Sequence, residues 1–158
     1  MDASKLPSVV PPDLSTKTVL LHSTDVKMNR YENRWASFEN WPFRGDCHCT
    51  PERLAAAGLY HCPTEHEPDL FRCYVCFKEM HNWDPNDDPH TEDARNANCA
   101  FIRLAKQEDN FTVLDFLVLE KERAQNRARK VLELFEQETG QAMREVHYEL
   151  DKLRRKLR

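Results

Sequence analysis

Glycine is scarce in this chain, at three of its 158 residues. All-β folds with many tight turns, collagen-like chains and low-complexity chains are rich in glycine, so these classes are excluded. Long apolar runs are also missing: no stretch approaches the roughly 18 uncharged apolar residues of a membrane helix, and we expect no membrane association. The first seven residues lack the apolar core of a secretory signal, which predicts a reducing compartment.

Signatures of catalysis are missing too. No Ser–His–Asp order, phosphate loop or paired-carboxylate motif stands out, and no second Cys/His cluster of the ubiquitin-ligase kind follows the first. The sequence therefore predicts a protein that is not an enzyme.

Charge is distributed unevenly along the chain. Residues 39–98 carry a net charge of −7, whereas residues 120–158 carry +3, with five bases in the last seven positions. This asymmetry predicts two surfaces with different partners. Only the basic tail could bind nucleic acid non-specifically through its charge, and we expect no sequence-specific binding of nucleic acid.

The chain divides into four parts. Residues 1–30 read as a disordered arm, in which Val19–Leu20–Leu21 is the only patch able to dock. Residues 31–102 predict an α+β module of short helices around a small sheet. Its expected elements are a helix over 31–38, a helix capped by Thr50 and ended at Gly58, strand-like segments at 59–61 and 71–75, and a helix from Pro89 that carries Cys99.

A linker over 103–117 leads to one long helix over 118–158. From Leu117 to Leu157, apolar and small residues recur every three or four positions, the period of an α-helix. At 1.5 Å per residue this helix is roughly 60 Å long. Because that exceeds the breadth of a 70-residue domain, the helix needs a partner to cover its apolar stripe.

Six cysteines lie within 53 residues. Cys73 and Cys76 form a C-x-x-C pair, and Cys99 follows 23 residues later, a spacing that favours a tetrahedral Zn²⁺ site. Three buried free cysteines or a redox pair are the alternatives. The other three, Cys47, Cys49 and Cys62, have no such spacing and read as core or exposed thiols.

Several segments resemble the baculoviral inhibitor-of-apoptosis repeat. They are Arg34–Phe38, Cys47–Arg53, Ala57–Gly58, His61–Glu65, Cys73–Glu79, Trp83–Pro85 and Asp87–Pro89. Phe77–Lys78 replaces the double glycine usual in caspase-binding repeats. Together with the single repeat and long helix, this resembles the family members that act in cell division, and the resemblance covers residues 31–158.

The resemblance implies a zinc site with three cysteines and a histidine as the fourth ligand. This chain has no histidine at the corresponding position. Counting from Cys76 places Asp93 at that position, and carboxylate oxygen is an acceptable zinc ligand. The nearest histidine, His90, is the alternative fourth ligand.

The resemblance also implies a peptide groove for the free N-terminus of a phosphorylated histone tail. An α-amino group needs carboxylates and a small apolar slot, and strand addition supplies backbone hydrogen bonds. The expected groove residues are Glu67, Lys78, Met80, His81, Trp83, Asp87 and Arg95. A solvated acidic turn around a core tryptophan is the alternative interpretation.

Three further expectations follow from the resemblance. Phe101, Phe111, Val113 and Phe116 would form a homodimer contact, unless they pack back onto the module. Val131, Phe135, Val146 and Leu150 would bind helices of borealin and inner centromere protein. Thr50, before Pro51, would be a phosphorylation site, although its capping role alone explains it.

The function implied is a scaffold of the chromosomal passenger complex, with Aurora B kinase as an indirect partner, in chromosome segregation and cytokinesis. Its expected locations are the nucleus, the centromere and kinetochore, the spindle midzone and midbody, and the cytoplasm. The alternative is an inhibitor of apoptosis that acts on caspases or their antagonists through the same groove.

Overall fold

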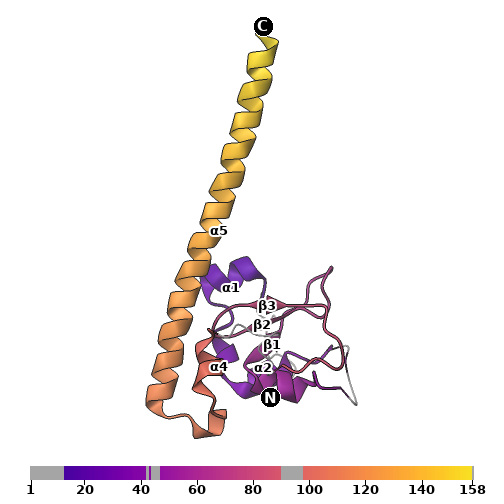
Figure 1. The fold of residues 1–158 in the computed structure, drawn as a ribbon, viewed down its shortest axis with the longest axis vertical. Helices are drawn as coiled ribbons and strands as arrows, with labels where there is room; N and C mark the ends of the chain where they lie inside the picture. The colour runs from indigo at the N-terminus through magenta and orange to yellow at the C-terminus, as the bar shows by residue number, and fades with distance from the viewer. Residues whose placement is uncertain (1–12, 42, 44–46, 90–97, 158) are drawn as a thin grey trace, which may run out of the picture.

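The computed structural model describes residues 13–41, 43, 47–89 and 98–157. A small module of short helices and a three-stranded sheet lies beside one end of a long helix, which extends far beyond it (Figure 1). The α+β class and the long C-terminal helix expected from the sequence are confirmed.

The module contains a short antiparallel sheet and several short helices. The sheet has the order β1 (Leu59–His61), β2 (Phe71–Cys73) and β3 (Glu79–Met80). The helices around it are α1 (Thr16–His22), the 3-10 turn η1 (Val26–Asn29), α2 (Tyr31–Ala36), α3 (Pro51–Ala56), α4 (Ala100–Leu104) and the 3-10 turn η2 (Glu108–Asn110). The long helix is α5 (Val113–Lys156).

Helix α3 begins and ends where the sequence predicts. The amide of Arg53 donates to Thr50 Oγ1 at 3.4 Å, and Pro51 takes the first helical position. Gly58 follows the helix with a φ of +79°, a conformation that favours glycine. A Cβ there would lie 2.9 Å from the Phe101 ring, so the close approach also requires glycine.

Aromatic rings form the centre of the core. Trp41 packs edge-on against Phe38 and Phe71, and Phe71 in turn packs against Trp83 at 4.8 Å between ring centroids. The guanidinium of buried Arg34 donates to the carbonyl oxygens of Met28 and Ala55, and it pairs with Glu108. These contacts fix α2 against α3 and against the segment before α5.

The expectation of a disordered arm over residues 1–30 is wrong for residues 13–30. Helix α1 forms there, and Val19 and Leu20 are buried in a small cluster with Phe77, against which Val131 of α5 also packs. The short apolar patch therefore docks, because the module and α5 together cover it. Residues 1–12 lie outside the described part of the chain.

Helix α5 begins at Val113, inside the segment expected to be a linker. A capping box explains the early start: Thr112 Oγ1 accepts from the amide of Asp115, and the Asp115 carboxylate accepts from the amide of Thr112. Cys99 likewise differs from expectation, since it is the N-cap of α4. The helix expected to start at Pro89 would run through residues 90–97, which are not described.

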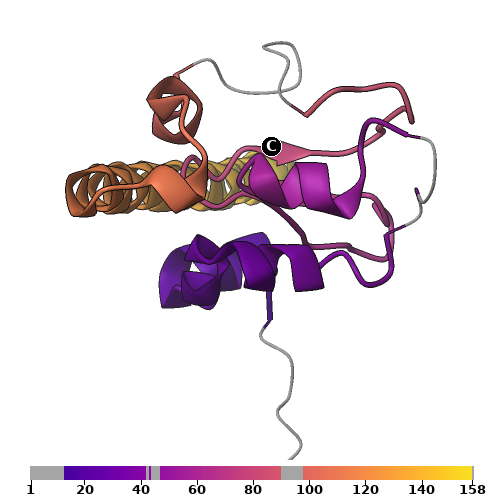
Figure 2. The ribbon, with the colours of Figure 1, turned by 90° about the horizontal axis from the view of Figure 1, so that it is seen from below.

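The first half of α5 lies between α1 on one side and α4 on the other, as Figure 2 shows from below. Arg123 and Arg127 of α5 both pair with the fully buried carboxylate of Asp25. Within the described residues, no helix is long and apolar enough to cross a membrane.

Candidate metal centre and peptide groove

Three cysteine thiols converge at one end of the sheet. Cys73 ends β2, Cys76 lies on the turn that leads to β3, and Cys99 comes from the start of α4. The turn closes through Phe77, whose amide donates to the carbonyl of Cys73 and whose φ is +57°. The three sulfur atoms lie within 4.8 Å of one another, so the sequence-predicted cluster is brought together.

The sulfur separations fit a metal ion. Cys73 Sγ and Cys99 Sγ are 3.7 Å apart. Two thiolates that bind one tetrahedral zinc at about 2.3 Å stand about 3.8 Å apart, whereas a disulfide requires about 2.05 Å. As thiols, the three hydrogen-bond to one another, and the bond with Cys73 raises the pKa of Cys99 to about 11. A bound cation would reverse this by favouring the thiolates.

The two residues expected as the fourth ligand, Asp93 and His90, lie outside the described residues. The remaining cysteines do not join the cluster. Burial raises the pKa of both Cys49 and Cys62 to about 12, which makes them unreactive core thiols.

Strand β3 is the edge of the sheet at which a peptide could add. The amide of Cys73 donates to the carbonyl of Lys78, and Phe71 lies opposite Met80. In an antiparallel ladder hydrogen-bonded pairs alternate, so the backbone amide and carbonyl of Glu79 point away from β2. Strand addition needs such an outward-facing pair.

Next to this edge lie the apolar slot and the acidic turn. Met80 and Trp83 are largely buried, and the Trp83 amide donates to Asp69. Asp87 is exposed and turns back to accept from the amide of Asp84, while His81 Nε2 lies 3.5 Å from Glu67 Oε1.

The structure thus brings most of the expected groove residues to one edge of the sheet, with Lys78 just before β3. Trp83 has 8% of its surface exposed, which also satisfies the alternative of a core tryptophan under an acidic turn. Arg95 lies outside the described residues.

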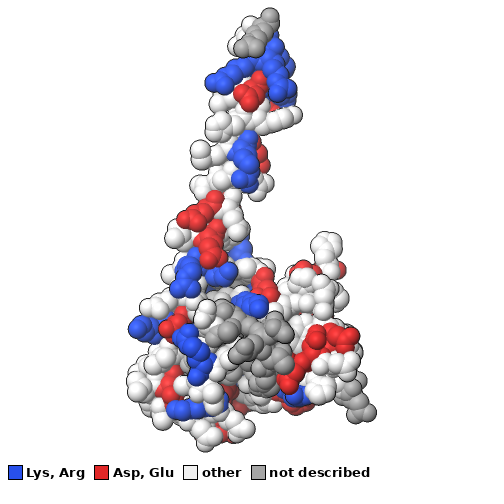
Figure 3. Space-filling model, viewed as in Figure 1, with Lys and Arg blue, Asp and Glu red and all other residues white. Residues whose placement is uncertain are grey.

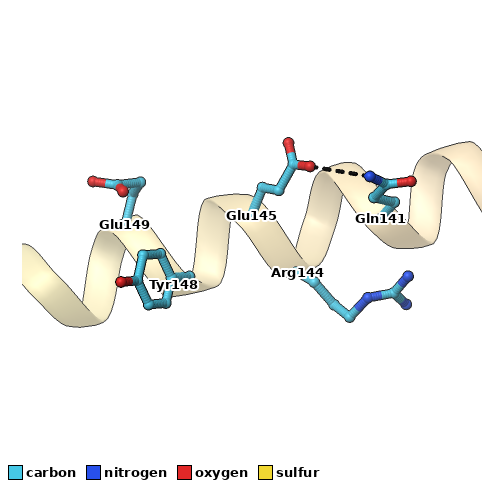
Figure 4. A pocket seen from close by; sticks show the side chains of 5 residues that line it. All are labelled: Gln141, Arg144, Glu145, Tyr148 and Glu149. Atoms are coloured by element: carbon cyan, nitrogen blue, oxygen red, sulfur yellow. Dashed lines mark hydrogen bonds between the residues drawn. The ribbon is translucent and has the colours of Figure 1, made fainter.

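The expected partner stripe on α5 is mostly open. Phe135, Val146 and Leu150 have 51%, 59% and 47% of their surface exposed, whereas Val131 packs partly against α1. Figure 4 shows a distal stretch of α5, Gln141 to Glu149, whose side chains project from a single helix. The contact drawn there is the hydrogen bond from Gln141 to Glu145, within α5 itself.

The expected homodimer residues divide into two pairs. Phe101 is buried and packs edge-on against Phe111. These two residues therefore pack onto the module, which was the alternative to a homodimer contact. Val113 and Phe116 are exposed on the first turns of α5. The expected contact did not include their exposed apolar neighbours Leu114, Leu117 and Val118, although the apolar character of residues 113–118 is visible in the sequence.

Thr50 caps α3 and lies at a surface pocket. The pocket is also lined by Trp35, whose indole donates to Glu52 at 3.1 Å, and by Pro51. The capping bond explains this threonine in full, and phosphorylation stays a prediction.

Comparison with known proteins identifies a matching domain family and several similar relatives. The model of the Inhibitor of Apoptosis domain (BIR) matches residues 34–103. Baculoviral IAP repeat-containing protein 5 of Rattus norvegicus is 44% identical over 123 residues, which are 77% of this chain and 87% of the relative. The Mus musculus protein of that name is 51% identical over 61% of this chain and 70% of its own length.

A further relative and one solved structure are also similar to this chain. Baculoviral IAP repeat-containing protein 5.1-A of Xenopus laevis is 44% identical over 75% of this chain and 78% of its own length. The crystal structure of DIAP1 BIR1 bound to a Grim peptide is 27% identical over 60% of this chain and 90% of that chain, with a TM-score of 0.41. With its domain match and these relatives, the chain belongs to the baculoviral inhibitor-of-apoptosis repeat family, in the group of survivin.

Proposed function

We propose that this protein is a non-enzymatic scaffold of the chromosomal passenger complex. Its repeat would bind a phosphorylated histone tail, and its helix α5 would bind helices of borealin and inner centromere protein, with Aurora B kinase as the indirect effector. It would act in chromosome segregation and cytokinesis, at the centromere and kinetochore, the spindle midzone and midbody, and in the nucleus and cytoplasm.

The observation that carries the proposal is the open apolar stripe of α5. The helix has 44 residues, so at 1.5 Å each it is about 66 Å long, and its distal part extends well beyond the module (Figure 1). Figure 3 shows uncharged surface between charged groups along α5, with Lys and Arg gathered at its far end. An exposed stripe of this kind is typical of a helix that assembles with other helices.

The zinc ion would have a structural role. Cys73, Cys76 and Cys99 would hold it with Asp93, or His90 in its place. An ion held by three thiolates and closed by a fourth ligand leaves no open position for catalysis. It would fix the turn before β3 to α4, and so hold the groove strand in place.

The groove supports peptide recognition through two features of opposite charge. Asp87 and Glu67 would receive the free α-amino group next to Trp83 and Met80, and Lys78 would receive the phosphate. Such hydrogen bonds to charged groups contribute about 1.5–3 kcal/mol each.

Calorimetry with four peptides tests this recognition. The peptides share a core-histone N-terminus and are free or acetylated at the amine, and phosphorylated or not at a nearby threonine. We expect the free phosphorylated peptide to bind most tightly, and each single change to weaken binding by about 1–3 kcal/mol. Equal affinity for free and acetylated peptides would exclude the amine pocket.

The alternative function is inhibition of apoptosis through the same groove, without use of α5. A co-precipitation with α5 removed after Lys130 separates the two. Loss of borealin and inner centromere protein is expected of the scaffold, whereas capture of caspases or their antagonists by both forms would favour the inhibitor.

A further inference from the structure

A cleft of about 380 Å³ opens where β3 begins. The module supplies one wall with Phe77 and Lys78, α1 supplies Leu20, and α5 supplies the opposite wall with Lys130 and Gln137. Residues far apart in the sequence thus meet at the end of the edge strand where the proposed phosphate-binding lysine lies.

The cations in this cleft differ in how firmly they are held. Arg72 is buried, and its guanidinium already donates hydrogen bonds to Glu79 Oε1 and to Thr16 Oγ1. Lys130 pairs with Glu133 at 2.9 Å, one turn along the same helix, and both side chains are 44% exposed. An exposed pair of this kind is weak and is easily exchanged for a stronger anion.

Lys78 is the other lysine in the cleft. Within the part of the chain that the structure describes, it forms no ion pair. Two lysines that line one small cleft, one without a salt bridge and one weakly paired, raise the local potential for an anion. A phosphate dianion has three acceptor oxygens and can take hydrogen bonds from both ammonium groups.

The direction of a bound peptide brings its phosphate to this cleft. With its amine beside Trp83 and Asp87, a peptide that adds to β3 must run antiparallel to the strand, toward Lys78. The four positions from Trp83 back to Glu79 span at most about 13 Å at 3.3 Å per residue, so a side chain within about four residues of the amine reaches the start of β3. The cleft begins there.

We propose that Lys130 of α5 is the second cation of the phosphate site, so that the phosphate of the peptide is held between Lys78 and Lys130. This inference rests on the proposed peptide recognition and extends it. Because Lys130 belongs to α5, the bound phosphate joins the repeat to the helix that carries the partner stripe.

The test compares Lys130→Gln with Lys152→Gln in the full chain. Lys152 is the matched control, since it pairs with Glu149 three residues away on the same helix, far from the cleft. Binding of the phosphorylated and unphosphorylated free-amine peptides is measured by calorimetry, with inorganic phosphate as a third ligand. Thermal unfolding of each variant checks that its fold is unchanged.

We expect Lys130→Gln to weaken binding of the phosphorylated peptide by about tenfold, the loss of one charge-assisted hydrogen bond. Binding of the unphosphorylated peptide should not change, and Lys152→Gln should behave as the unaltered protein does. Displacement of the phosphorylated peptide by millimolar inorganic phosphate, in the unaltered protein but not in Lys130→Gln, would show that the cleft binds phosphate from either source.

Two outcomes would overturn the inference in different ways. If the unaltered protein prefers the phosphorylated peptide and Lys130→Gln keeps that preference in full, Lys130 is not part of the site, while the proposed function stands. If the unaltered protein binds both peptides equally, or neither, the proposed phosphopeptide recognition fails, and the role of Lys130 fails with it.

Discussion

The sulfur atoms of three cysteines and the carboxylate of Asp25 are polar groups that join segments distant in the sequence. The thiols lie at the separation that one tetrahedral ion requires. Asp25 is fully buried and faces two arginines of α5. Each arrangement ties together segments that are distant in the sequence, so a single substitution should affect the whole module.

Replacing Cys76 with serine should remove the bound zinc and unfold the module. Three thiolates supply most of the affinity, and a small core depends on such a crosslink. We expect one zinc per chain in the unaltered protein and none in the variant, measured by metal analysis together with circular dichroism. A purified, folded protein without zinc would contradict the site.

The fourth ligand can be tested with the same measurement. Asp93→Ala should weaken zinc retention against a chelator more than His90→Ala does, because spacing places Asp93 at the position of the missing histidine. A greater loss in His90→Ala would assign the ligand to His90 instead.

Replacing Asp25 with asparagine should destabilise the protein by about 3 kcal/mol or more, because two arginines would face a neutral amide in a buried site. Urea unfolding measures the loss. Asp151→Asn is the control: it removes an exposed pair with Arg154 and should cost about 0.5 kcal/mol or less. Similar losses in both variants would show that burial of Asp25 contributes little.

At the scale of single residues, the sequence predicted the cluster of three cysteines but did not predict the buried carboxylate of Asp25. The spacing of Cys73, Cys76 and Cys99 is a local signal that points to one kind of chemistry. Asp25 gives no such signal, since its partner Arg127 lies 102 residues away. Only the fold shows that this aspartate is buried and paired.

Among the elements, α3 and α5 were predictable, and α1 was not. Thr50, Pro51 and Gly58 mark α3 with local capping chemistry, and the apolar period marks α5. Helix α1 has only seven residues, too few for a stable isolated helix, so its stability comes from Val19, Leu20 and their contacts with Phe77 and Val131.

The start of α5 has a pH dependence that can be measured. The hydrogen bond from Lys106, followed by those from Thr112, lowers the pKa of Asp115 to about 2. A carboxyl with a lowered pKa in the folded state stabilises that state above its ordinary pKa of 3.8, and this stabilisation disappears as the pH falls toward 2.

Asp115→Asn should therefore lower the urea midpoint of unfolding at pH 6, with a difference from the unaltered protein that shrinks below about pH 4. Asp109→Asn is the control, because it makes the same change of charge on an exposed residue just before the helix. A difference that stays constant down to pH 3 would show that the Asp115 carboxylate does not support the capping box.

At the scale of the whole molecule, one face of α5 packs against the module and another face stays exposed. Leu119, Arg123 and Asn126 face the module, and Asn126 donates to the carbonyl of Val75. At 100° per residue, Phe135 and Val146 lie on a different side, and they remain open once the module and α1 have packed. The sequence predicted an uncovered stripe because the helix is too long for its module. It could not show that α1 packs against Val131.

Replacing Phe135 and Val146 together with glutamate should abolish binding of borealin and inner centromere protein and leave the zinc module folded. Burial of each side chain contributes roughly 1.5–3 kcal/mol, so losing both should weaken binding by at least about a hundredfold. Co-purification of the three proteins measures the effect, and zinc content reports on the module.

Tyr148→Glu is the matched control for this double variant, since Tyr148 is also an exposed, largely apolar residue of α5. It follows Val146 by two positions and so lies about 200° around the helix from it. If partners pack against the stripe alone, this control should keep them. Loss of partners in the control as well would mean that they surround α5, and retention of partners by the double variant would mean that the stripe is not the interface.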